Sequence, residues 1–274
     1  MVDLPPHDPG QLRDDLSIHS LLCSAHVEMM ICSQRSLYMF SDLGNVPLLL
    51  HDDGSLTPAD INLINTKLPN ARIISRSEAN KKALDLLPNF PEIHKYRKNQ
   101  IMALKLVDVG LWAKGSRTLY IDSDILFFSP PHELIDAVKP DARKNLFNKD
   151  IFDSYVAPRQ QIEEALGYGP KQSVNAGLWA MNTSVIDFDK IERWLKEPVF
   201  NLRPHYYTLD QTFISMLANI SEDGCDYFPA EYDVSFEKSS ADCCVKHYVG
   251  AIRHGFELEG LEQLMQSFKD TLVK

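Results

Sequence analysis

Residues 117–128 read RTLYIDSDILFF. The apolar run Leu119–Ile121 predicts a buried strand, and it stops at two carboxylates, Asp122 and Asp124. A second apolar run follows and ends at Ser129-Pro130-Pro131. Ionised carboxylates at the end of a buried strand need a partner. A shared Mg²⁺ or Mn²⁺ ion is one such partner, because both ions prefer carboxylate oxygens and keep positions open for substrate phosphates.

An Asp-x-Asp alone is more often part of a solvated turn than of a metal site, so the surrounding chain has to decide. Apolar runs predict short strands at residues 18–24, 46–50 and 71–75, and helical spacing predicts helices at 26–40, 57–68 and 77–87. This alternation is typical of parallel βαβ units. Open sheets of that kind bind ligands outside the carboxyl ends of their strands, which is where Asp122 and Asp124 are expected.

The remaining chain continues the mixed pattern. The spacing of Ile101, Leu104 and Val109 predicts one helix over residues 98–109, closed by Gly110. Further strands are predicted at 174–182, 225–234 and 243–248, and further helices at 159–166, 187–197, 207–220 and 258–273. We therefore expect a flexible arm at residues 1–15 and a single α/β domain at 16–274, with a mostly parallel twisted sheet flanked by helices.

Composition narrows the classes of partner. The 274 residues are 44% hydrophobic, which allows a sizeable core, and the formal net charge of −10 argues against nucleic acid or an anionic membrane as the main partner. No apolar run approaches the ~18 residues of a transmembrane helix, and the first residues lack a signal-peptide pattern. Five scattered cysteines predict reduced thiols and a cytoplasmic location, with Cys243 and Cys244 buried.

Four further segments carry polar groups suited to a phosphate or sugar ligand. They are Lys105, Asn175-Ala176-Gly177, Asp210-Gln211 and the stretch His247–Arg253. Together with Asp122-Ser123-Asp124, and in this order, they resemble the metal-dependent retaining glycosyltransferases of the glycogenin and bacterial lipopolysaccharide galactosyltransferase family. The resemblance covers about residues 18–255. It implies the nucleotide-diphosphosugar transferase fold, type A, with a nucleotide-sugar half at about 16–130 and an acceptor half at about 131–274.

The resemblance also implies a metal site. Asp122, Asp124 and His247 would bind Mn²⁺ (or Mg²⁺), which bridges the phosphates of the donor in that family, with Ser123 beside them. Gly250 follows His247 at the family's spacing and would let the backbone approach the diphosphate. Arg253 stands where the family has Lys and would grip phosphate as a fork. His254-Gly255 departs from the Pro-Trp usual there.

For the sugar, the resemblance implies catalytic or binding roles for Asn175, Asp210 and Gln211. Lys105, 17 positions before Asp122, matches a basic residue that contacts the donor. Ser24 is the nearest polar residue for the nucleoside, and residues 52–55 (Asp-Asp-Gly-Ser) are a second candidate. Each feature also has a purely structural explanation: a bulge at Asn175, a helix cap at Asp210, a solvated charge at Lys105 and a core histidine at His247.

The expected function is transfer of a hexose from a nucleotide diphosphosugar, UDP-linked, to a glycan or other acceptor that the sequence does not identify, with retention and Mn²⁺ dependence. Two alternatives stay open. A sugar nucleotidyltransferase would need a Gly-rich loop after the first strand, and residues 22–35 contain no glycine. A nucleotide-sugar-binding module without turnover would keep the pocket and lack the reaction.

Overall fold

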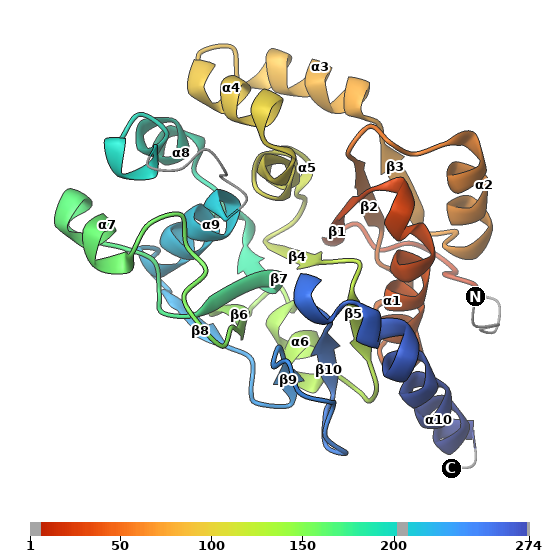
Figure 1. Ribbon diagram of the computed structural model, residues 1–274. Helices are drawn as coiled ribbons and strands as arrows, with labels where there is room; N and C mark the ends of the chain where they lie inside the picture. Colours follow the sequence, from red (N-terminus) through yellow and green to blue (C-terminus); the bar gives the residue numbers. More distant parts are fainter. Residues whose placement is uncertain (1–6, 202–207, 273–274) are drawn as a thin grey trace.

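The computed structural model describes residues 7–201 and 208–272. A seven-stranded sheet in the order β3-β2-β1-β4-β7-β6-β8 forms its centre (Figure 1). The strands are β1 Leu16–Leu22, β2 Leu48–Asp52, β3 Ala71–Ile74, β4 Arg117–Ile121, β6 Asn145–Lys149, β7 Val174–Asn182 and β8 Cys225–Tyr227. The first four run parallel, β7 is antiparallel to both β4 and β6, and β8 is parallel to β6. This confirms the predicted α/β class and the mostly parallel sheet.

A second sheet, of three strands, begins with β5, which is the next strand after β4. Its order is β5-β10-β9, with β5 Ile125–Phe127, β9 Tyr232–Asp233 and β10 Val245–His247. β10 runs antiparallel to β5, and His247 pairs with Ile125. Because Ile125 directly follows Asp124, this register brings a residue from the far end of the chain to the predicted pair of carboxylates.

Helices cover both faces of the large sheet. They are α1 Val27–Phe40, α2 Pro58–Lys67, α3 Arg76–Leu86, α4 Pro91–Asn99, α5 Val107–Trp112, α6 His132–Ala137, α7 Arg159–Leu166, α8 Phe188–Trp194, α9 Leu209–Asn219 and α10 Leu261–Leu272. Two hydrophobic clusters result, and β4 contributes alternate residues to them. Leu119 and Ile121 pack on the side of α1, while Tyr120 packs on the side of α9.

Two predicted elements were wrong. The helix predicted over residues 98–109 is three pieces: α4 ends at Asn99, a 3₁₀ turn spans Ile101–Lys105, and α5 begins at Val107. Gly110 does not close a helix. It lies inside α5, where a Cβ would stand 2.6 Å from Ile186 Cγ2, so packing and not capping explains this glycine.

The strand predicted over residues 225–234 is also two elements, since β8 and β9 belong to different sheets. The predicted ends at Tyr207 and Val273, and residues 1–6 of the predicted arm, lie outside the described residues. Within the rest of that arm, the His7 ring stacks on Tyr38 and the Arg13 N–H donates to Asn45 O. None of the helices in the described part of the chain is long and apolar enough to cross a membrane.

Two histidines are buried between β1 and β2. His19 Nδ1 lies 3.0 Å from His51 Nε2, and Ser17 Oγ lies 2.8 Å from His19 Nε2. Both rings have at most 1% of their surface exposed. Burial, reinforced by the neighbouring His51, lowers the pKa of His19 well below its usual value. Burial, reinforced by Arg97 and Lys82, lowers the pKa of His51 from 6.5 to about 3.

This pair predicts loss of stability in acid. A base whose pKa is lower in the folded state binds more protons when unfolded, so its contribution is full above pH 6.5 and is lost as the pH falls toward 3. The free energy of unfolding, measured with urea, should fall by about 1.4 kcal/mol per pH unit for each such histidine in that window. His51→Gln should make the free energy of unfolding depend less steeply on pH in this window, whereas His132→Gln, at an exposed position, should leave that dependence unchanged. An unchanged slope in His51→Gln would contradict the assignment.

Candidate functional site

Asp122 follows the last residue of β4 and is fixed there by backbone and side-chain contacts. Its N–H donates to Gly177 O of β7 at 2.7 Å. The Tyr120 hydroxyl donates to Asp122 Oδ1 at 2.8 Å, and Lys105 Nζ donates to Oδ2 at 3.0 Å. The broken helix before β4 is what delivers Lys105, because Lys105 ends the 3₁₀ turn between α4 and α5.

Asp124 is buried against two groups from the C-terminal part of the chain. Its Oδ1 lies 3.1 Å from His247 Nε2, and its Oδ2 accepts from Arg253 Nε at 2.9 Å and Nη2 at 2.8 Å. Burial by itself would raise the pKa of Asp124, but His247 and Arg253 outweigh it and hold the pKa below its usual range. Ligand atoms of Asp122, Asp124 and His247 all lie within 4.8 Å of one another.

Asn175 orients the His247 ring. Asn175 Oδ1 accepts from the Gly177 N–H at 3.0 Å, which identifies this atom as the oxygen, and it lies 2.9 Å from His247 Nδ1. Nδ1 therefore carries the proton, and Nε2 of a neutral ring directs its lone pair at the Asp124 carboxylate. Two electron-rich atoms facing each other call for a positive charge between them, and a divalent cation meets that need as well as a second ring proton does.

Gly177 leaves the space that the imidazole occupies. A Cβ at this position would stand 2.1 Å from His247 Cε1, closer than any real contact allows. The Asn-Ala-Gly segment thus positions the His247 ring in two ways: Asn175 contacts Nδ1, and Gly177 leaves space for the ring. The sequence contained this glycine, but only the packing of the His247 side chain against β7 explains it.

Lys105 and Asp210 form the other side of the cluster. Lys105 Nζ lies 4.0 Å from Asp210 Oδ2, and both side chains are at least 95% buried. Burial would lower the pKa of Lys105, but Asp122 and Asp210 outweigh it and raise the pKa. Burial raises the pKa of Asp210 to about 6, partly offset by Lys105. Asp210 Oδ1 has no hydrogen-bond partner within residues 7–201 and 208–272, so this oxygen is available to accept a hydrogen bond from a ligand.

Gln211 has both ends of its amide engaged. Its Oε1 accepts from the Ala176 N–H at 3.0 Å, and its Nε2 donates to Ser154 O at 3.0 Å. In this structure the side chain ties α9 to β7 and to the loop after β6.

A pocket adjoins the Asp122–Asp124 pair at the carboxyl ends of β1, β2 and β4. Ser24, predicted for the nucleoside, is not among the residues that line this pocket, and its hydroxyl donates to Asp60 Oδ2 at 2.7 Å. Besides the two aspartates, the residues that line the pocket include Arg253, Cys23, His26, Asp53, Ile101 and Met102. The prediction missed His26, Ile101 and Met102. His26 lies only a few residues beyond β1, whereas Ile101 and Met102 reach the pocket because of the unexpected 3₁₀ turn.

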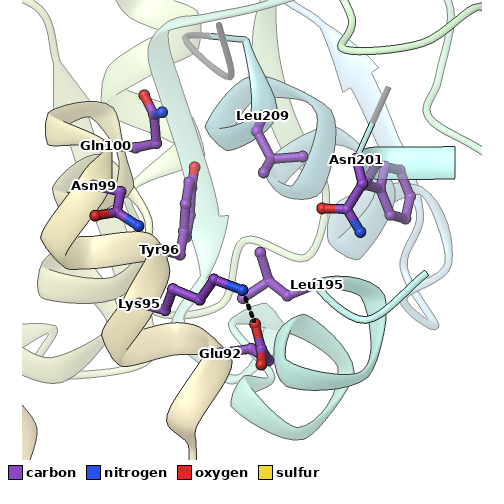
Figure 2. A pocket seen from close by; sticks show the side chains of 9 residues that line it. Glu92, Lys95, Tyr96, Asn99, Gln100, Leu195, Asn201 and Leu209 are labelled. Atoms are coloured by element: carbon purple, nitrogen blue, oxygen red, sulfur yellow. Dashed lines mark hydrogen bonds and ion pairs between the residues drawn. The ribbon is translucent and has the colours of Figure 1, made fainter. Parts of the chain in front are cut away.

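A second pocket lies between α4, the segment 195–201 that follows α8, and Leu209, the first residue of α9 (Figure 2). Tyr96, Leu195, Phe200 and Leu209 form an apolar part, and amides and the Lys95–Glu92 ion pair line the rest. Leu209 directly precedes Asp210, but the pocket contains none of the three clustered ligand residues. The candidate site is therefore the carboxyl end of β4.

The close approach at Gly177 gives a direct test of the cluster. Gly177→Ala should displace the His247 ring and weaken divalent-cation binding by about tenfold or more, as loss of an orienting contact does in metal sites. Mn²⁺ affinity is the measurement, with circular dichroism to show that the fold persists. Gly169→Ala is the matched control, because its Cβ would meet only the flexible Glu163 side chain. Equal Mn²⁺ affinity in both variants would argue against His247 as a ligand.

Comparisons with known proteins bear on the fold. No protein-family model matches the chain, and no curated protein does. Among solved structures, the galactosyltransferase LgtC in complex with donor and acceptor sugar analogues is similar, with 13% identity, a TM-score of 0.60, and coverage of 93% of this chain and 95% of that one. Mouse xyloside xylosyltransferase 1 has 13% identity and a TM-score of 0.55 over 87% and 99% of the two chains.

A third similar structure is core-mannan synthase A from Aspergillus fumigatus in an Mn/GDP form. It has 10% identity and a TM-score of 0.51 over 82% of this chain and 76% of that one. At such identities the likeness concerns the fold. The sheet order, the second small sheet at the end of β4 and these similarities together show that the chain adopts the type A glycosyltransferase fold.

Proposed function

We propose that the protein is a glycosyltransferase that moves a hexose from a nucleotide diphosphosugar, UDP-linked, to an acceptor hydroxyl, with retention at the anomeric carbon and with Mn²⁺ (or Mg²⁺) as cofactor. The observation that carries the proposal is the cluster of Asp122, Asp124 and His247 beside a pocket at the carboxyl ends of the parallel strands. That edge is where α/β sheets bind nucleotides. Similar solved structures include complexes with donor and acceptor analogues and with Mn and GDP.

The donor set fits a hard divalent ion. Two carboxylates and an oriented imidazole supply oxygen and nitrogen ligands, and Asn175 fixes the ring so that Nε2 faces the carboxylates. Asp122, Asp124 and His247 would hold the ion, which when bound supplies positive charge next to the departing diphosphate. Lys105 contacts Asp122 and Arg253 contacts Asp124, and both would add positively charged hydrogen-bond donors to the phosphate oxygens.

Asp210 would bind the sugar. Its Oδ1 lacks a partner in the described structure and its Oδ2 faces Lys105, so a donor hydroxyl can complete its hydrogen bonding. Asp210 lies in the buried first turn of α9, on the side of the metal cluster where Lys105 contacts both Asp122 and Asp210. Asn175 contacts His247 and donates to Asp150 at 3.2 Å. It would therefore influence the binding of the sugar indirectly, by holding the His247 ring in position.

Retention favours a front-side displacement. A double displacement needs a free nucleophile, and the amide of Gln211 is held at both ends by backbone groups. The other candidate, Asp210, faces Lys105 and is assigned to a hydroxyl of the sugar. In the front-side route, the bond between the anomeric carbon and the diphosphate oxygen breaks. The acceptor oxygen bonds the anomeric carbon from the same face, and its proton passes to the departing phosphate oxygen. The protein contributes position and charge.

Ligand-induced stabilisation tests the donor. UDP and Mn²⁺ together, at about 100 times the dissociation constant, should add about 2.7 kcal/mol and raise Tm by several degrees, because only the folded state assembles the site. UDP with EDTA should give a much smaller shift. A shift with GDP and none with UDP would overturn the UDP assignment, and no shift with any nucleotide would favour a different ligand class.

Asp124→Asn should abolish Mn²⁺-stimulated transfer and donor hydrolysis. The change removes one ligand charge and the partner of Arg253 while keeping the side-chain volume, so circular dichroism should show a native fold. Sugar release from a panel of UDP-hexoses is the readout. Asp136→Asn, on the exposed face of α6, is the control. If Asp124→Asn retained most of its metal-stimulated turnover, the assigned cluster would not be the metal site.

A further inference from the structure

Arg253 occupies one oxygen of a proposed metal ligand. Both its Nε and its Nη2 donate to Asp124 Oδ2, at 2.9 and 2.8 Å, while Asp124 Oδ1 faces His247 Nε2. Two donors on a single carboxylate oxygen saturate it. The guanidinium therefore competes for the same carboxylate that the proposed cation needs.

Arg253 is also placed so that it can leave. Its side chain is 39% exposed, against 5% for Asp124. Arg253 directly follows the short 3₁₀ turn Gly250–Ile252 and is one of the residues that line the pocket. The space in front of Gly250 is open, because a Cβ there would meet only Arg253 Nη2, at 4.0 Å. The guanidinium thus has a free volume beside it toward which it can turn.

Lys105 contrasts with Arg253. It engages the other carboxylate, Asp122, but it is 5% exposed and is enclosed by Tyr120 and Asp210. It has neither the exposure nor the open neighbouring space of Arg253. Of the two cationic side chains on the Asp122–Asp124 pair, Arg253 is the one that can exchange partners without opening the core.

Charge decides when that exchange is favourable. The cluster contains three carboxylates, Asp122, Asp124 and Asp210, and two positively charged side chains, Lys105 and Arg253. A divalent cation added alone leaves Arg253 beside a like charge and without its partner. A diphosphate added with the metal restores the balance, because its oxygens match the planar guanidinium fork.

From this geometry we propose that Arg253 is a gating residue that couples the two ligands. It holds Asp124 when the diphosphate is absent and transfers to the diphosphate when metal and nucleotide bind together, so that each ligand tightens the binding of the other. The inference rests on the proposed function. It adds that Arg253 weakens metal binding on its own and strengthens it in the presence of nucleotide.

The test is a matrix of Mn²⁺ affinities, measured by titration calorimetry with and without UDP. In the natural protein, UDP should raise Mn²⁺ affinity by about tenfold or more, within the range usual for coupled sites. Arg253→Gln should bind Mn²⁺ alone about tenfold more tightly, and UDP should then raise its Mn²⁺ affinity by a smaller factor than in the natural protein, because only the direct attraction between metal and diphosphate remains. Arg253→Lys, which keeps the charge but loses the fork, should fall between the two. Arg193→Gln, which removes an exposed charge on α8, should match the natural protein.

The outcomes separate the inference from the function on which it rests. If UDP and Mn²⁺ bind cooperatively to the natural protein but Arg253→Gln binds Mn²⁺ alone equally or more weakly, Arg253 only positions Asp124 and the gating role is wrong. The gating role is also wrong if the coupling survives unchanged in both Arg253 variants. If Mn²⁺ binds to none of these proteins, even with UDP, the proposed metal-dependent function fails as well. Thermal unfolding of each variant shows whether it is folded.

Discussion

The candidate site depends on the contacts that keep Asp124 ionised although its side chain is buried. Only 5% of this side chain is exposed, and an isolated carboxylate there would be strongly destabilising. Its partners, His247 and Arg253, come from more than 120 residues further along the chain. The antiparallel pairing of β5 with β10 is what brings them there. The small sheet thus positions site residues from distant parts of the chain.

The same constraint links three sequence segments that look unrelated. Asn175 fixes the tautomer of His247, Gly177 leaves space for its ring, and the Gly177 carbonyl accepts from the N–H of Asp122. One short stretch of β7 therefore supports two of the three proposed ligands. Such supporting contacts set ligand orientation as firmly as the ligands themselves do, and they account for a glycine that no backbone strain requires.

On the opposite side, buried charges are arranged as a mixed cluster with a slight excess of negative charge. Lys105 contacts both Asp122 and Asp210, and Tyr120 adds a neutral donor. Arg253 closes the cluster from the solvent side. A site of this kind is poised for a cation and an anion bound together, since either one alone leaves unmatched charge in a region of low dielectric constant.

The sequence alone predicted the fold class, most of the first four parallel strands and the carboxylate pair Asp122–Asp124, because hydrophobic periodicity and strand-end carboxylates are local signals. The other residues of the cluster, His247, Lys105 and Asp210, were predicted only through the family resemblance. The sequence failed at residues 98–110, where a regular helical spacing hid a break: the 3₁₀ turn Ile101–Lys105 separates α4 from α5, and Lys105 at its end contacts Asp122 and Asp210. It also could not find His26 and Met102 in the pocket, turn Ser24 toward Asp60, or pair Arg253 with Asp124. Those features are decided by contacts between distant segments, whose geometry exists only once both sheets have formed.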